Sequence, residues 1–321
     1  MKRRHFIVGA LAAGLPLPAL SQSNDFPSKT IRILIAASPG GGSDLVGRTV
    51  ATKLSEIDKW SVVAENKPGA SGSLALTELS RSAPTGYDLG VGLTEIYSVA
   101  PQLMKVPFVP IRDFTPIAIV ASTPSVFVVR ADSNIQTLKQ MVDEAKAKPG
   151  SITFGSSGNG SAAHIAGELL QKDAQVKLTH IPYKGSAPAV VDVLGGHIKV
   201  ACTSIASAQP QLKAGNLRAL AVTGAKRDPS LPDTPSAVEL GYPNVVINSW
   251  FGILGPAKMP VDVVQKLNAS INQVTSRQDV KERLATAGLV TSPMSAEEFG
   301  SMIRSEYSKM TDIIRSAGIS F

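Results

Sequence analysis

Along most of the chain, short runs of hydrophobic residues alternate with longer amphipathic stretches. Short apolar runs such as residues 31–36 predict buried strands, and longer amphipathic stretches such as residues 45–57 predict helices, the latter with Asp44 as its N-cap. Further strands are expected at residues 62–65, 87–93, 117–120, 126–130, 152–154, 178–181, 198–201, 217–222 and 245–254. Further helices are expected from residue 73 and at residues 138–148, 161–172, 187–194, 261–275, 278–287 and 296–317. This alternation is typical of α/β proteins with largely parallel sheets.

The length of 321 residues predicts two compact units, although no repeat or low-complexity linker separates them. Small, polar and proline residues gather at 121–125 and 223–229, so we expect the chain to cross between two lobes at both places. The first lobe would then comprise residues 22–123 and 227–321, and the second would comprise residues 124–226.

The N-terminus has the order of features found in a signal peptide. Lys2, Arg3 and Arg4 precede an apolar run at residues 6–15, and small residues follow, with cleavage expected after Ser21. The apolar run is shorter than the roughly 20 residues that span a bilayer. We therefore interpret residues 1–21 as a signal peptide for export to the periplasm. The arginine pair also resembles a twin-arginine signal, and the general secretory route stays open.

Composition narrows the classes of partner. The chain has 32 Lys+Arg and 25 Asp+Glu, and loss of the signal peptide would leave 29 basic residues against 25 acidic ones. No run of like charges concentrates this excess, so we expect no nucleic-acid partner, whereas a mild positive excess suits an anionic ligand. The single cysteine, Cys202, excludes an intrachain disulfide and lies in an apolar run, where it is expected to be buried.

The first candidate binding segment is the glycine loop, residues 38–44, between an expected strand and an expected helix. Gly40, Gly41 and Gly42 would let a ligand approach the backbone closely, with Ser38 beside them. The N–H groups at the start of the helix would then hold an anion. A tight strand–helix turn explains the same residues equally well. The loop lacks the Lys and Ser/Thr of a P-loop, and Leu45 stands where a dinucleotide fingerprint has its last glycine.

The second candidate is the serine loop, residues 155–161, which also follows an expected strand and precedes an expected helix. Ser156, Ser157, Asn159 and Ser161 could hold a second carboxylate, and the alternative is a flexible loop with Ser161 as an N-cap. Ligands of open α/β sheets bind beyond the carboxyl ends of the strands. Two facing lobes would therefore place both loops in one cleft.

Catalytic and metal-binding interpretations have less support. His164, His180 and His197 are scattered without metal-ligand spacing, and no Gly-x-Ser-x-Gly elbow is present. We therefore expect no enzyme, no metal and no cofactor, with a serine-dependent hydrolase as the remaining enzymatic alternative. His180 is expected to pack beside Pro182 and Tyr183. His164 follows the serine loop by one helical turn and is a candidate ligand contact, although a structural role is the alternative.

Several segments together resemble one family. They are 38–44, Glu65-Asn66-Lys67-Pro68-Gly69-Ala70-Ser71-Gly72, 155–161 with His164, His180-Ile181-Pro182-Tyr183-Lys184-Gly185-Ser186, Leu220-Ala221-Val222-Thr223, Ala225-Lys226-Arg227 and Ser249-Trp250-Phe251-Gly252. In this order they resemble the Bug family of periplasmic receptors, which serve tripartite tricarboxylate transporters. The similarity extends over nearly the whole chain after the expected signal peptide.

The resemblance implies a type II periplasmic binding protein, in which two α/β lobes close over a small carboxylate. Ser38 and Gly40 to Gly42 would face one end of the ligand, the serine loop would face the other, and Thr94 would add a hydroxyl. The protein is then expected to be a monomer that delivers its ligand to membrane transporter subunits. A sensory subunit that signals to a membrane partner would use the same closed, liganded form and stays open as an alternative.

Two departures from the family pattern bear on the ligand. Cys202-Thr203-Ser204 replaces the usual Phe-Asp-Asn, so a carboxylate that could bind an amino group is lost and the hydroxyls of Thr203 and Ser204 become candidate contacts. Ala37 replaces the aromatic residue that usually precedes the glycine loop, which should widen the pocket. We therefore expect a ligand that lacks a cationic amine and is bulkier than a small dicarboxylate.

Overall fold

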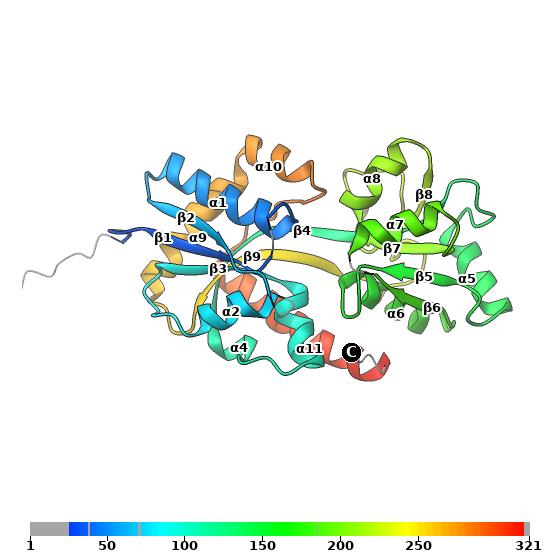
Figure 1. The fold of residues 1–321 in the computed structure, drawn as a ribbon, viewed down its shortest axis with the longest axis horizontal. Helices are drawn as coiled ribbons and strands as arrows, with labels where there is room; N and C mark the ends of the chain where they lie inside the picture. The colour runs from blue at the N-terminus through cyan, green and yellow to red at the C-terminus, as the bar shows by residue number, and fades with distance from the viewer. Residues whose placement is uncertain (1–25, 38, 70–71, 184, 318–321) are drawn as a thin grey trace, which may run out of the picture.

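The computed structural model describes residues 26–37, 39–69, 72–183 and 185–317, and it contains two α/β lobes (Figure 1). The expected signal peptide at residues 1–21 lies outside the described residues, and so does Ser38. Two long strands and the C-terminal helix run between the lobes in Figure 1.

The sheet of the first lobe has the strand order β2-β1-β3-β9-β4. Its strands are β1 (Ile31–Ile35), β2 (Val62–Asn66), β3 (Asp88–Leu93), β9 (Asn248–Pro256) and the first part of β4 (Phe114–Arg130). β1 pairs in parallel with β2 and β3, whereas β9 is antiparallel to both β3 and β4. Ile33, Leu34 and Ile35 are all fully buried, as expected for a strand with helices on both faces.

Helices cover both faces of this sheet (Figure 1). One face carries α1 (Gly42–Ile57), α9 (Val261–Ser276) and α10 (Gln278–Ala285), whose apolar residues pack with Ile33 and Ile35. The other face carries α2 (Ser73–Ser80), α4 (Pro110–Asp113) and α11 (Ala296–Ala317). There Leu34 and Trp250 pack among residues that include Leu76 and Phe299. The period-3.6 pattern of each long helix thus points its apolar side at the sheet.

The second lobe repeats this layering. Its strands are β5 (Thr153–Ser156), β6 (Thr179–Pro182), β7 (Val200–Ser204) and β8 (Leu217–Val222), which assemble on the last part of β4. Its helices are α5 (Leu138–Ala147), α6 (Ala162–Ala174), α7 (Ser186–Leu194) and α8 (Ile205–Lys213). Buried Phe127 and Phe154 belong to the core with α5 and α6, and Val126 and Val128 to the core with α7 and α8.

Thr223 forms hydrogen bonds with two other chain segments, at Ser125 and Ile247, where the chain crosses between the lobes. Its hydroxyl accepts a hydrogen bond from the backbone N–H of Ser125 at 2.8 Å and donates one to the carbonyl of Ile247 at 2.8 Å. Its own N–H and carbonyl bond to Ser125 and Ile247 as well. Thr223 is fully buried, so these bonds are shielded from water and fix the three segments to one another.

Most expected strands and helices are present, and their ends lie within a few residues of the expected positions. Four features differ from the expectation for physical reasons. The strands expected at 117–120 and 126–130 are one strand, β4, which pairs with β9 up to Pro124 and with β7 and β8 beyond it. The sheets are therefore mixed rather than largely parallel. Asp44 is not the N-cap, because α1 begins at Gly42 after Gly41. The sequence also did not predict α8, which contains Pro210.

The second crossing differs from the expected one at 223–229. Ser236 bridges Val222 of β8, and Ala237, Val245 and Ile247 belong to the core of the second lobe. Residues 228–245 therefore pack with the second lobe, and the chain returns to the first at β9. The boundary expected after residue 226 does not match this packing.

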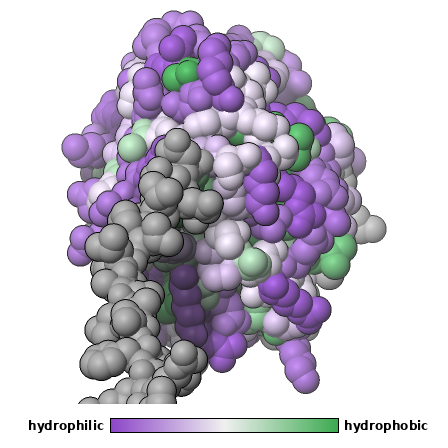
Figure 2. Space-filling model, turned by 90° about the vertical axis from the view of Figure 1, so that its left-hand side faces the viewer, coloured by the Kyte–Doolittle hydropathy of each residue, from purple (hydrophilic) through white to green (hydrophobic). Residues whose placement is uncertain are grey.

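Among the described residues, no helix is long and apolar enough to cross a membrane. Figure 2 shows the end of the first lobe as a mostly hydrophilic surface with scattered hydrophobic residues. Single exposed apolar side chains of this kind are ordinary on protein surfaces.

Candidate ligand-binding site

A cavity of about 340 Å³ lies between elements of the two lobes. The first lobe contributes Glu95 and Val99 from η2 (Glu95–Val99), a single turn of π-helix, and Ala100 from α3 (Ala100–Leu103). The second lobe contributes the serine loop, through Ser157, Asn159, Gly160 and Ser161. Of the sequence-predicted site residues, this cavity brings together Ser157, Asn159 and Ser161.

The serine loop is shaped by its own hydrogen bonds. The Ser161 hydroxyl accepts the N–H of His164 at 3.2 Å and donates to the carbonyl of Gly158 at 2.7 Å, which makes Ser161 the N-cap of α6. Gly158 has φ +131°, so a side chain there would strain the loop. Ser157 and Asn159 differ from Ser161, because no side-chain hydrogen bond links them to another described residue. Their donors therefore remain for a ligand at the positive end of α6.

Ser156 stabilises the serine loop from within the protein and does not face the cavity. It is fully buried, and its hydroxyl lies 2.7 Å from Nε2 of His180. The ring of His180 stacks on His164 with centroids 3.8 Å apart, and it also contacts Phe154. This packing differs from the expected contact with Pro182 and Tyr183. Burial and the neighbouring His164 lower the pKa of His180 to about 4, so the ring is neutral at neutral pH.

His164 is likewise buried and braced inside the second lobe. Its Nδ1 accepts the N–H of Gly160 at 3.0 Å, and its Nε2 lies 3.5 Å from Oε1 of Glu168. Both ring nitrogens thus have partners within the protein. The ligand contact expected for His164 and Ser156 stays a prediction, and in this structure neither lines the cavity.

The described part of the glycine loop, residues 39–44, lies at the start of α1 and does not line this cavity. The N–H of Gly40 donates to Oδ2 of Asp44 at 3.0 Å, so the turn uses one of the groups expected to bind ligand. Asp44 also accepts hydrogen bonds from Arg48 and Asn66, and these bonds hold its pKa below the usual range. A Cβ at Gly41 would meet no atom within 4 Å, which leaves its backbone open to approach.

Three other residues that were predicted to contact the ligand have hydroxyls that bond within the fold or are buried in it. Thr94 is fully buried, and its hydroxyl accepts the N–H of Trp250 at 3.1 Å and donates to the carbonyl of Asn248 at 3.3 Å. Ser204 is the N-cap of α8. Thr203 is fully buried, and its hydroxyl has no hydrogen-bond partner among the described residues. None of the three lines the cavity.

Sequence reasoning missed Glu95, which is the only ionisable side chain among the described residues that line this cavity. A lone carboxylate in an otherwise apolar stretch directly after β3 could have indicated it, because the carboxyl ends of these strands face the other lobe. Its Oε1 accepts a hydrogen bond from the hydroxyl of Ser249 at 2.7 Å.

A second carboxylate lies behind η2. Glu306 of α11 accepts hydrogen bonds at Oε1 from the indole N–H of Trp250 at 2.7 Å and the hydroxyl of Ser98 at 2.8 Å. Burial, with a smaller contribution from Glu95, raises the pKa of Glu306 to about 7 against the lowering effect of these bonds. Glu306 lines a separate cavity of about 430 Å³ between α11 and the strands of the crossing.

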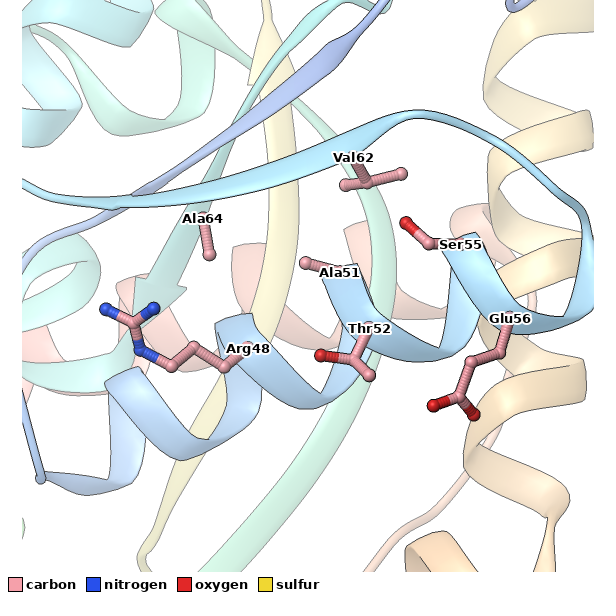
Figure 3. A pocket seen from close by; sticks show the side chains of 7 residues that line it. All are labelled: Arg48, Ala51, Thr52, Ser55, Glu56, Val62 and Ala64. Carbon is pink, nitrogen blue, oxygen red and sulfur yellow. The ribbon is translucent and has the colours of Figure 1, made fainter.

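A further hollow, of about 460 Å³, lies on the flank of the first lobe. Figure 3 shows that its lining comes from α1 and the edge strand β2, with Arg48 and Glu56 along the helix. It receives no residue from the second lobe, so closure of the lobes would not enclose a ligand there. Among the described residues, no group of three or more His, Cys, Asp or Glu side chains could hold a metal ion.

Residues 46–319 match the model of the tripartite tricarboxylate transporter family receptor, TctC. The chain belongs to this family. It is 29% identical to the protein BugT of Bordetella pertussis over 99% of this chain and 98% of that protein. Members of this Bug-type family are periplasmic receptors, so the chain is a receptor and the hydrolase alternative is excluded.

Solved structures of two proteins with similar sequences show the same fold. An R. palustris protein, Rpa4515, solved with adipate, is 28% identical, with a TM-score of 0.79 over 92% of this chain and 99% of that chain. MatC from Rhodopseudomonas palustris, solved with bound malate, is 27% identical, with a TM-score of 0.74 over 90% of this chain and all of that chain. The fold is therefore that of a type II periplasmic binding protein with two α/β lobes, as expected.

Proposed function

We propose that this chain is a periplasmic receptor that captures a small carboxylate between its lobes and delivers it to the membrane subunits of a tripartite tricarboxylate-type transporter. The observation that carries the proposal is the cavity between η2 and the serine loop, where Ser157 and Asn159 have free donors at the start of α6. An anion bound there would gain from the helix dipole and from hydrogen bonds of the loop.

The two ligand-bound neighbours support this choice of ligand, because the acids in their structures are adipate and malate. Backbone N–H groups of Gly41 and Gly42, with Ser38, would complete the site from the first lobe when the lobes close. The cysteine is not involved, since Cys202 is buried and burial raises the pKa of its thiol.

A thermal-shift screen of the purified protein against mono-, di- and tricarboxylates, with amino acids and sugars for comparison, tests the proposal. A carboxylate at about 100 times its Kd should add about 2.7 kcal/mol to the free energy of unfolding. Stabilisation by sugars alone, or by none of the acids, would contradict it.

Delivery to a transporter is tested in cells. Uptake of the identified acid should require both this protein and the membrane subunits of the transporter. Unchanged uptake after deletion of the receptor, with loss of a transcriptional response to the acid, would favour the sensory alternative instead.

Residues 1–21 would direct export. The N-terminal sequence of the protein recovered from the periplasm should begin at Gln22. Replacement of Arg3 and Arg4 by lysine separates the two routes, because only twin-arginine export should stop. The receptor would act as a monomer, which light scattering of the purified protein checks with and without ligand.

A further inference from the structure

Glu95 occupies a fixed position in the wall of the cavity. It is the first residue of η2, directly after Thr94, whose hydroxyl binds the backbone of β9 at Asn248 and Trp250. Ser249, on the same strand, donates to Oε1 of Glu95 at 2.7 Å. The carboxylate is therefore held at both its backbone and its side chain before any ligand arrives.

One oxygen of this carboxylate lacks a partner. Oε2 of Glu95 is buried and has no hydrogen-bond donor among the described residues. No Lys, Arg or His of the described chain forms an ion pair with Glu95 either. Leaving a buried charged acceptor unpaired is costly, and a donor supplied from outside would offset that cost.

The surroundings of Glu95 make a donor more favourable than a second anion. Its acidic neighbour is Glu306, whose pKa Glu95 helps to raise. A carboxylate of the ligand would be repelled at this wall. The opposite wall has the reverse preference, because the serine loop offers the donors of Ser157 and Asn159 at the N-terminal end of α6.

We propose that the ligand carries, besides the carboxylate held by the serine loop, a hydroxyl or ammonium group that donates a hydrogen bond to Oε2 of Glu95. This inference rests on the proposed function and names the class of acid: hydroxy- or amino-carboxylates rather than unsubstituted ones. An ammonium donor would differ from the expectation, drawn from Thr203, of a ligand without an amine, whereas a hydroxyl donor agrees with it.

Calorimetric titration with matched acids tests the proposal. Three sets are compared, each at one chain length: succinate, malate and aspartate; glutarate, 2-hydroxyglutarate and glutamate; adipate, 2-hydroxyadipate and 2-aminoadipate. In the set that binds best, the hydroxy or amino acid should bind roughly tenfold to a hundredfold more tightly than its unsubstituted analogue. The hydroxy and amino members separate the two kinds of donor.

Two variants locate the effect. Glu95→Gln keeps the acceptor for Ser249 and the shape of the side chain, and it should shrink the preference to less than about threefold. Glu282→Gln, at an exposed glutamate of α10, is the control and should keep the full preference. Thermal unfolding of each variant shows that it is folded before titration.

The outcomes separate this proposal from the function on which it rests. Equal or tighter binding of the unsubstituted acids, or an unchanged preference in Glu95→Gln, overturns the role of Glu95 and leaves a carboxylate receptor intact. Failure of all nine acids to bind the wild-type protein overturns the proposed class of acid, and it overturns the receptor function as well if no carboxylate of the thermal-shift screen stabilises the protein.

Discussion

Ser156 and His180 lie 24 residues apart in the chain, yet the serine hydroxyl is 2.7 Å from Nε2 of the imidazole. In another setting this pair would suggest a nucleophile and its base. Here the Ser156 hydroxyl is buried, His164 stacks on His180, and the chain belongs to a family of receptors. The pair therefore braces the wall of a binding site.

The low pKa of His180 makes the protein sensitive to acid. The folded pKa is about 4 and the unfolded value about 6.5, so the unfolded chain takes up a proton first as the pH falls. The contribution of the neutral ring is present above pH 6.5 and is lost as the pH falls through 4. Urea denaturation should show that wild-type protein loses about 2 kcal/mol more than His180→Gln between pH 7 and pH 4.5.

His197→Gln is the matched control for this titration, because the side chain of His197 is 71% exposed. Its pH profile should follow that of the wild-type protein. Parallel profiles for His180→Gln and the wild-type protein would show that protonation of His180 is not linked to folding.

Ionisation of Glu306 changes the stability with pH in the opposite direction. Its folded pKa of about 7 lies above the unfolded value of 4.5, so its contribution to stability is fully present below pH 4.5 and is lost as the pH rises through 7. Glu306→Gln keeps an acceptor for Trp250 and Ser98 but cannot ionise. Relative to wild type, this variant should gain about 3 kcal/mol in free energy of unfolding between pH 4.5 and pH 8. A constant difference across that range would place the ionisation of Glu306 outside the folding equilibrium.

Thr203 and Thr223 offer a matched test of buried hydroxyls. Thr203→Val replaces a hydroxyl that has no partner among the described residues, so the variant should be about 1 kcal/mol more stable. Thr223→Val removes two hydrogen bonds at the crossing and should lose about 2 kcal/mol or more. Denaturant midpoints measure both. A Thr203→Val variant with weaker ligand binding would show that ligand reaches this residue, as the sequence predicted.

The glycine loop is tested by a substitution that spares the fold. Gly41 has φ −89° and open space around its Cβ position, so Gly41→Ala should cost at most about 1 kcal/mol of stability. If the ligand approaches this backbone closely, the added methyl group should nevertheless lower the affinity at least tenfold, by roughly 1.4 kcal/mol. Unchanged affinity would leave the glycine loop with only its role as a turn.

Gly72→Ala should be much more destabilising than Gly41→Ala. A Cβ at this position would clash with Cδ1 of Ile96, and its φ is +87°. Because backbone strain and a clash add there, this variant should lose several kcal/mol of stability. Equal thermal stability of the two alanine variants would contradict this interpretation of the loops.

The sequence indicated the elements well where one local pattern determines the structure. The apolar run of β1 and the amphipathic stretch of α11 were predicted closely, since each buries one stripe or segment against a sheet. The segment around Pro124 was expected to cross between the lobes, but its small and polar residues gave no sign that β4 continues through the crossing as one strand.

The site was less predictable, because its chemistry depends on contacts between distant residues. Ser156 and Ser157 are equivalent in sequence, and only the position of His180 separates the bracing hydroxyl from the free one. Glu95 is bound to Ser249, 154 residues away, and no local pattern indicates that pairing. Burial of Thr203 likewise follows from the pairing of β7 with β4.

Isothermal titration of one variant tests most directly whether carboxylates bind in the cavity between η2 and the serine loop. Asn159→Ala removes an exposed side chain that forms no hydrogen bond with another described residue, and Asn216→Ala, at another exposed asparagine of the second lobe, is the control. For the acid that stabilises the wild-type protein most, Asn159→Ala should raise the Kd at least tenfold, roughly 1.4 kcal/mol, while Asn216→Ala leaves it unchanged. The same Kd in the wild-type protein and both variants would contradict the placement of the ligand in this cavity.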